Sequence, residues 1–275
     1  MGTGEALAGH LASCVVHLRR NLMAFHETVL ITGGARRIGR AIALDFAGRG
    51  WQVGIHFNTS APEAARLVRE ITGNGGRAAA LQADLADATA ASGLVAQCAA
   101  ALGPPICLVN NASLFLSDTI ATLDASQWDQ QMAVNLRAPA LLAQSFAAHL
   151  PKSVNGNIVN IIDQRVWKPT PHFFSYSVAK AGLWWITQTL AQALAPRIRV
   201  NGIGPGPVLA STHQTPEQFD RQRAATPLER GSTAEEIAAA IRFILDAPAM
   251  TGQMIALDGG QHLAWCTPDV TSLTG

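Results

Sequence analysis

Short apolar segments with strand character alternate with longer segments of helical periodicity along this 275-residue chain. The strand-like segments are Thr28 to Thr32, Gln52 to His56, Ala78 to Gln82, Ile106 to Asn110, Asn157 to Ile161, Arg199 to Ile203 and Met254 to Ala256. Helical patterns fill the intervals at Ile38 to Ala47, Pro62 to Ile71, Thr89 to Ala101, Trp128 to His149, Ser175 to Ala195 and Ala234 to Leu245. Because βαβ crossovers are right-handed, this order predicts a doubly wound α/β fold with a mostly parallel sheet. Ligands of such sheets bind at the carboxyl ends of the strands, so we expect functional residues directly after strands.

A single domain is expected, because 275 residues suit one large α/β domain. We expect residues 28–275 to form this domain. Residues 1–27 are weakly apolar, and Arg19 and Arg20 come near their end. A signal peptide carries its basic residues before the apolar region, so this order does not suit one. We therefore expect them to be a poorly ordered extension.

The composition argues against several classes of partner. Charged residues make up only 14% of the chain and the formal net charge is +1, so no basic face for nucleic acid is expected. The cysteines Cys14, Cys98, Cys107 and Cys266 are far apart and form no Cys-x-x-Cys pair, which predicts no metal site and a reducing, cytoplasmic location. No apolar run reaches the roughly 20 residues that span a bilayer, so no membrane association is expected.

A glycine-rich turn follows the first strand and leads into a helix. Its sequence is Thr32-Gly33-Gly34-Ala35-Arg36-Arg37-Ile38-Gly39-Arg40. Small residues let the backbone approach a pyrophosphate, and the helix N-terminus supplies free N–H groups and a positive dipole end. The turn therefore predicts a dinucleotide site at Gly33, Arg36, Arg37, Ile38 and Gly39, although Arg40 replaces the third glycine of the usual fingerprint.

The end of the second strand indicates which nicotinamide cofactor would bind. An acidic residue there would accept hydrogen bonds from a ribose 2′-hydroxyl and repel a 2′-phosphate. The strand is instead followed by Asn58, Thr59 and Ser60, and Arg36 or Arg37 can pair with a phosphate from the neighbouring turn. This pattern favours NADP(H) over NAD, with Arg37 as the preferred phosphate ligand.

Polar residues also follow the third and fourth strands. Asp84 and Leu85 come after the third strand, and Asn111, Ala112 and Ser113 come after the fourth. An aspartate at the first position can hold an adenine amino group, and a small Asn-Ala pair lets the chain pass beside the nicotinamide ribose. We therefore add all five to the cofactor site.

Three further polar residues lie in helical segments. Tyr176 is the only tyrosine of the chain, and Lys180 lies four residues later on the same helix face. An ammonium in that position can lower the pKa of the phenol and make it a proton donor near neutral pH. Asn135 is a polar residue in an otherwise apolar segment, where a scaffolding or proton-relay role is favoured.

These motifs resemble those of the short-chain dehydrogenase/reductase family from about Thr28 to Ala264. The shared features are the glycine-rich turn, Asp84, Asn110-Asn111-Ala112, Asn135, Tyr176 with Lys180, Pro205-Gly206 and Asp258-Gly259-Gly260, in the family's order and spacing. The resemblance implies a seven-stranded Rossmann-type fold, hydride transfer with a nicotinamide cofactor, and a homotetramer. It also implies that Tyr176 donates a proton, that Lys180 holds the ribose and lowers the pKa of Tyr176, and that Pro205 and Gly206 contact the cofactor.

One position departs from the family pattern. The family usually carries a serine 13 residues before the tyrosine to bind a substrate carbonyl, and here that residue is Asp163. A carboxylate would repel a developing alkoxide, but beside Tyr176 it can retain or relay a proton to a ring nitrogen. Asp163, Tyr176 and Lys180 thereby resemble the triad of pteridine reductases and the similar dihydromonapterin reductases.

Two neighbouring residues match the same branch of the family. Ser113 and Phe115 follow the Asn-Ala pair, and a flat heterocycle suits a slot between Phe115 and the nicotinamide. We expect Ser113, Phe115, Asp163, Tyr176 and Leu209 to bind substrate. The expected catalytic group is Asp163, Tyr176, Lys180 and Asn135.

The sequence thus predicts NADPH-dependent reduction of a 7,8-dihydropterin to a tetrahydropterin, with the proton delivered through Tyr176 or Asp163. One alternative is a general NADP-dependent carbonyl or 3-oxoacyl reductase, against which Asp163 argues. Another is a catalytically silent NADP-binding protein, against which the intact Tyr176, Lys180 and Asn135 argue.

Overall fold

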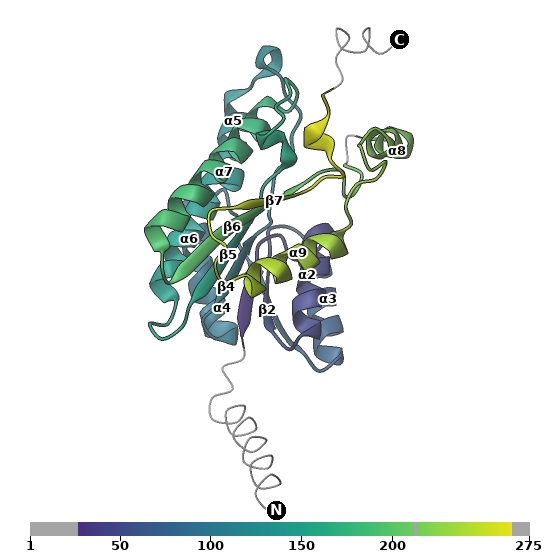
Figure 1. The fold of residues 1–275 in the computed structure, drawn as a ribbon. Helices are drawn as coiled ribbons and strands as arrows, with labels where there is room; N and C mark the ends of the chain where they lie inside the picture. The colour runs from purple at the N-terminus through teal and green to yellow at the C-terminus, as the bar shows by residue number, and fades with distance from the viewer. Residues whose placement is uncertain (1–26, 212–213, 266–275) are drawn as a thin grey trace, which may run out of the picture.

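The seven strands form a single parallel sheet, as predicted (Figure 1). The structure is a computed structural model that describes residues 27–211 and 214–265, so the expectation for residues 1–27 lies, except for Glu27, outside the described residues. The strand order is β3-β2-β1-β4-β5-β6-β7. The strands are β1 Thr28–Ile31, β2 Gln52–Phe57, β3 Arg77–Gln82, β4 Cys107–Asn110, β5 Gly156–Ile161, β6 Ile198–Pro205 and β7 Met254–Leu257. The order reverses between β1 and β4, which is where doubly wound sheets open a crevice for ligands.

Helices cover both faces of the sheet, and each face has its own apolar core (Figure 1). The helices are α2 Arg37–Gly48, α3 Ala61–Gly73, α4 Ala88–Leu102, α5 Ala125–Met132, α6 Ala138–His149, α7 Phe174–Leu194, α8 Pro216–Ala224 and α9 Ala234–Asp246. One core joins α2, α3 and α9 to the sheet, and the other joins α4, α6 and the end of α7. In the described part of the chain, no helix combines the length and the apolar character needed to cross a bilayer.

The helix predicted for residues 128–149 is present as one continuous helical segment that begins three residues earlier, at Ala125, and contains a wider turn. A π-helical turn, Ala133–Arg137, separates α5 from α6, and Pro139 lies in the first turn of α6. Proline has no N–H to bond the carbonyl four residues earlier, and a wider turn accommodates that loss.

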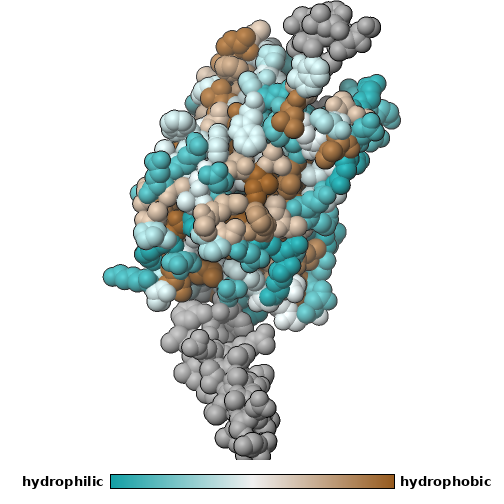
Figure 2. Space-filling view, in the orientation of Figure 1, coloured by the Kyte–Doolittle hydropathy of each residue, from teal (hydrophilic) through white to brown (hydrophobic). Residues whose placement is uncertain are grey.

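Helix α8 is absent from the sequence prediction. Thr215 and Gln218 cap it reciprocally and Pro216 opens it, but none of its residues is buried. A helix without a buried face shows no apolar periodicity, so its sequence does not look like a core-packed helix. Figure 2 shows that the surface at α8 is mostly hydrophilic.

Candidate active site

The glycine-rich turn after β1 leaves no room for side chains at two positions. Gly33 has φ +61°, and an added Cβ would lie 3.0 Å from the Cα of Ala112. At Gly39 an added Cβ would lie 2.2 Å from the Gly33 carbonyl oxygen. The side chain of the N-cap residue Arg36 makes no capping hydrogen bond to α2, which begins at Arg37, so Arg36 leaves the first N–H groups of the helix to an anion.

His56 holds this turn in place and was not predicted to do so. Its ring is buried at the end of β2; Nδ1 accepts a hydrogen bond from the Gly33 N–H at 3.0 Å, and Nε2 lies 3.1 Å from the Ala83 carbonyl oxygen. The ring must therefore be neutral with its proton on Nε2. Burial lowers the pKa of His56, which favours that form. The signal in the sequence was a polar residue inside an otherwise apolar strand.

The loop after β4 is tied to the turn after β1. Asn111 donates from Nδ2 to the carbonyls of Thr32, at 2.9 Å, and Gly33, at 3.1 Å. The Thr32 hydroxyl accepts from the backbone N–H groups of Asn111 and Ala112, both at 2.9 Å. These bonds fix the two strand ends on either side of the crevice.

A cleft of about 630 Å³ opens at this point, and we call it the Gly33 cleft. Of the predicted cofactor residues it is lined by Gly33, Arg36, Arg37, Ile38, Gly39, Asn58, Thr59, Ser60, Asp84, Leu85, Asn111, Ala112 and Ser113. Lys180, Pro205 and Gly206 line a neighbouring cavity instead. The structure therefore brings most of the predicted set together around one space.

The charged side chains Arg36, Arg37 and Asp84 of the Gly33 cleft have partners within the protein. Arg36 lies 3.8 Å from Glu63, while Arg37 donates to the carbonyls of Leu209 and Ala210. Asp84 accepts from the Ala86 N–H at 2.9 Å. Both arginines are exposed, so either can turn toward a phosphate without being drawn from a buried ion pair.

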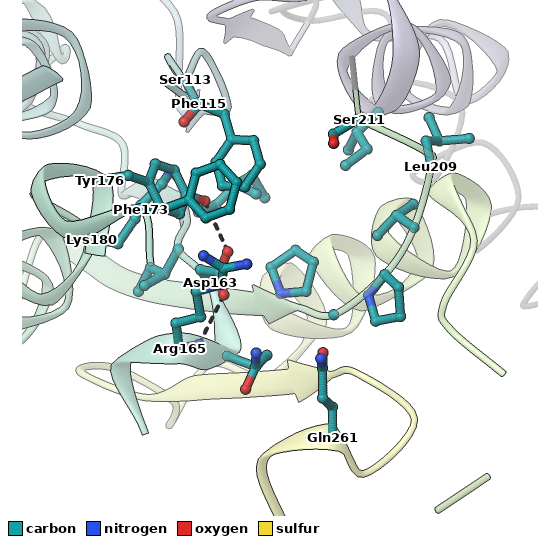
Figure 3. A pocket seen from close by; sticks show the side chains of 18 of the residues that line it. Ser113, Phe115, Asp163, Arg165, Phe173, Tyr176, Lys180, Leu209, Ser211 and Gln261 are labelled. Atoms are coloured by element: carbon teal, nitrogen blue, oxygen red, sulfur yellow. Dashed lines mark hydrogen bonds between the residues drawn. The ribbon is translucent and has the colours of Figure 1, made fainter. Parts of the chain in front are cut away.

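Tyr176, Lys180 and Asp163 meet where β5 ends and α7 passes over it (Figure 3). The Tyr176 hydroxyl donates to Asp163 Oδ2 at 2.9 Å, and Asp163 Oδ1 accepts the Arg165 backbone N–H at 2.8 Å. Lys180 Nζ donates to the Ile161 carbonyl at 2.8 Å and lies 5.6 Å from the centre of the Tyr176 ring. The predicted triad is thus assembled in the structure.

The surroundings shift the pKa of all three groups. Burial raises the pKa of Asp163, against the opposing effect of the Arg165 N–H. Burial and then the charge of Asp163 raise the pKa of Tyr176 well above its ordinary value, whereas burial lowers that of Lys180 to about 8. The expectation that Lys180 lowers the pKa of Tyr176 is therefore wrong: burial and the hydrogen-bonded carboxylate dominate. Tyr176 keeps its proton at neutral pH.

Asn135 lies in the π-helical turn and holds the loop after β4. Its Oδ1 accepts from the Leu114 N–H at 2.8 Å and from the Ser113 hydroxyl at 3.1 Å, and its Nδ2 donates to the Leu114 carbonyl at 2.9 Å. None of these bonds reaches Lys180, and the link to Tyr176 runs only through Ser113, whose side chain also acts on the phenol. The geometry supports the scaffolding role considered for Asn135.

The triad faces a cavity of about 570 Å³, which we call the Tyr176 cavity. The predicted Ser113, Phe115, Asp163, Tyr176, Lys180, Pro205, Gly206 and Leu209 all line it. Sequence reasoning missed Gln164 and Arg165, which follow Asp163, and the side chains of Phe219 and Gln222 from α8. Gln164 and Arg165 could have been predicted from their position next to Asp163. Nothing in the sequence pointed to Phe219 and Gln222, because α8 itself was not predicted.

Phe173 lies flat on Phe115 inside this cavity. Their ring centres are 4.1 Å apart and the planes differ by 10°. The ring of Tyr176 is nearly perpendicular to that of Phe115, with the ring centres 4.7 Å apart. Phe173 has φ +56°, an uncommon backbone conformation for a large side chain. Phe115 therefore already takes part in aromatic stacking, on one face, within the protein.

Comparisons with known proteins agree with this arrangement. The short chain dehydrogenase family model matches residues 27–222. The 3-oxoacyl-[acyl-carrier-protein] reductase of Synechocystis sp. is 32% identical over 240 residues, covering 85% of this chain and 96% of that protein. Two solved structures of FolM alternative dihydrofolate reductase 1, both in complex with NADP, are also similar.

The two structures come from Brucella species. The Brucella suis protein is 51% identical with a TM-score of 0.87, covering 90% of this chain and 99% of its own. The Brucella canis protein is 50% identical with a TM-score of 0.84, covering 89% of this chain and 97% of its own.

Proposed function

Because this chain belongs to the short-chain dehydrogenase family, we propose that it is an NADPH-dependent reductase of a pterin. The proposed reaction converts a 7,8-dihydropterin to a tetrahydropterin. The single observation that carries the proposal is the hydrogen bond from Tyr176 to Asp163 at 2.9 Å, at the wall of the Tyr176 cavity.

The Gly33 cleft fits a dinucleotide. Gly33 and Gly39 leave the backbone bare where a Cβ would collide, and the uncapped start of α2 offers N–H groups to a pyrophosphate. No acidic residue ends β2, which favours NADP(H), the cofactor of both Brucella structures. The proposed ligands are the predicted residues that line the cleft, joined by Lys180, Pro205 and Gly206 from the Tyr176 cavity. When bound, NADPH supplies the hydride.

The Asp163–Tyr176 pair suits protonation of a nitrogen better than stabilisation of an alkoxide. The Tyr176 hydroxyl points at the carboxylate, so its proton is already engaged, and a negative carboxylate nearby opposes a second negative charge. Burial raises the pKa of Asp163, so the pair can hold a proton that a basic ring nitrogen would take. Lys180 adds a positive charge on the other side of Tyr176.

Two of the substrate classes found among the relatives bear on this proposal, and sequence identity favours one of them. The two proteins described as alternative dihydrofolate reductases are 50% and 51% identical to this chain. The 3-oxoacyl-[acyl-carrier-protein] reductases of Synechocystis sp. and Staphylococcus aureus are 32% and 28% identical. Reduction of a dihydropterin is therefore favoured over reduction of a carbonyl compound as the proposed activity.

The test is loss of NADPH absorbance with the purified protein and a substrate panel. The panel holds 7,8-dihydrobiopterin, dihydromonapterin, dihydrofolate, several ketones and a 3-oxoacyl thioester. Turnover of dihydropterins with little or none of ketones is expected. Turnover of carbonyl compounds alone would replace the proposal with the reductase alternative, and tight NADPH binding without any turnover would replace it with the silent nucleotide-binding protein.

A further inference from the structure

The Tyr176 cavity contains a second cation, Arg165, whose charge acts on Asp163 and Tyr176 from beyond ion-pair distance. Arg165 follows β5 in a short 3₁₀ turn, Gln164–Val166, and its side chain reaches back toward Asp163 and the aromatic pair (Figure 3). Its Cζ atom lies 4.9 Å from the ring centre of Phe173 and 5.4 Å from that of Phe115. The guanidinium is thus held at the aromatic wall of the cavity.

The hydrogen-bonding capacity of this guanidinium is not used up within the described residues. Nη1 is shielded from solvent and has no hydrogen-bond partner there, and Arg165 forms no ion pair with a described carboxylate within 4.0 Å. Asp163 is bonded by the backbone N–H of Arg165 and not by its side chain. A buried donor without a partner is costly and uncommon, and at the wall of a cavity it can bond a ligand.

The preceding residue has the complementary property. Gln164 is 4% exposed, lines the same cavity, and its Oε1 has no partner among the described residues. An unused donor and an unused acceptor on adjacent residues match a lactam, in which a carbonyl oxygen and an N–H lie side by side.

A 7,8-dihydropterin carries such a lactam in the required place. Its 4-oxo oxygen lies beside N5, the nitrogen that is protonated in the proposed reaction, and N3–H follows the 4-oxo group on the same edge. A ring with N5 against the Asp163–Tyr176 pair would therefore direct its lactam along the residues next to Asp163.

We infer that Arg165 determines substrate specificity by donating to the 4-oxo oxygen of the pterin, with the Gln164 amide accepting from N3–H. Together they hold N5 against Asp163 and Tyr176. The inference rests on the proposed function and adds to it the ring edge that the site recognises.

The test compares two ligands that differ at this edge alone. These are 6-hydroxymethylpterin and 2,4-diamino-6-hydroxymethylpteridine; the second has an amino donor in place of the 4-oxo acceptor and no N3–H. Dissociation constants are measured on the NADP⁺-loaded full chain. Arg165→Leu is expected to weaken the 4-oxo ligand about 30-fold and the diamino ligand less than about 3-fold, because only the first loses a charged hydrogen bond.

Two controls separate recognition from damage. Every Arg165 variant keeps the backbone N–H that bonds Asp163, and NADP⁺ affinity and melting temperature report on folding. Arg165→Lys keeps a cationic donor and is expected to recover part of the discrimination. Equal weakening of both ligands would show that Arg165 only supports the aromatic stack, and unchanged affinity for both would show that it does not touch them; either result overturns the inference.

The wild-type protein distinguishes this failure from failure of the proposed function. If it binds neither ligand and reduces no dihydropterin, both the proposed function and this inference are refuted. If it reduces dihydropterins but Arg165→Leu treats the two ligands alike, only the role of Arg165 is refuted.

Discussion

The Gly33 cleft and the Tyr176 cavity adjoin, yet they are built from different parts of the chain. The first is formed mainly by backbone atoms, from glycines, a helix N-terminus and loops that hydrogen bonds of Asn111 and His56 hold together. Side chains dominate the second; they lie on α7 and α8 and on the segments that follow β4, β5 and β6. The nucleotide side is thus set by strand and turn geometry, and the substrate side by which side chains the loops present.

The largest expected effect separates chemistry from cofactor binding. Tyr176→Phe removes the proton that the hydroxyl donates to Asp163 and should lower kcat about 1,000-fold. NADPH affinity, measured by fluorescence titration, should stay within about 2-fold of wild type, because no atom of the Gly33 cleft changes. Retained turnover would remove Tyr176 from the mechanism.

A methyl group added in the Gly33 cleft is expected to have the opposite effect, a loss of cofactor binding. Gly39→Ala places a Cβ 2.2 Å from the Gly33 carbonyl oxygen, so the turn must shift and NADPH affinity should fall about 100-fold. Gly48→Ala, at the other end of α2, is the matched control, because no heavy atom lies within 4 Å of its added Cβ. Equal affinities for the two variants would contradict the assignment of the turn to the nucleotide.

A smaller effect is expected when Asp163 in the Tyr176 cavity is replaced by the serine that the family usually carries. Asp163→Ser removes the carboxylate that raises the pKa of Tyr176, so dihydropterin turnover should fall about 30-fold while ketone turnover rises. Asp163→Asn keeps the shape and removes the charge, and it should lose the first activity without gaining the second. Unchanged dihydropterin turnover in the Ser variant would show that Asp163 does not select the substrate.

The smallest effect concerns His56 and stability. Burial lowers the pKa of folded His56 below 6.5, so the unfolded chain binds a proton first as the pH falls. The free energy of unfolding should therefore decrease below pH 6.5, with a melting temperature lower by about 2 °C at pH 5.5. His56→Asn should flatten this dependence, whereas His149→Asn, at an exposed histidine, should not. A slope that survives in His56→Asn would mean that other groups cause it.

Local rules predicted the sheet, the turn after β1 and the shared helix face of Tyr176 and Lys180, whereas the place of Asp163 beside them was implied by the resemblance to pteridine reductases. Strand periodicity, glycine at tight approaches and the four-residue spacing of Tyr176 and Lys180 are all visible in the chain. The wider turn before α6 has a visible cause in Pro139, but helical periodicity alone does not distinguish a π-helical turn from an α-helical one.

Other features depend on tertiary packing that local patterns do not report. Phe173 stacks on Phe115, and the Arg165 side chain lies over the Phe173 ring. Both contacts depend on how the loops after β4 and β5 are placed in the folded protein. The direction of the pKa shift of Tyr176 was predicted wrongly for the same reason, since it depends on the burial of the phenol and then on the charge of Asp163 beside it.

Helix α8 separates two properties that usually constrain each other. It buries none of its residues, so substitutions along it change the hydrophobic core little, yet Phe219 and Gln222 form part of the cavity wall. Natural variation in α8 can thus alter the range of accepted substrates while the melting temperature stays almost constant. In this fold, substrate preference is able to evolve at a position where selection for stability is weak.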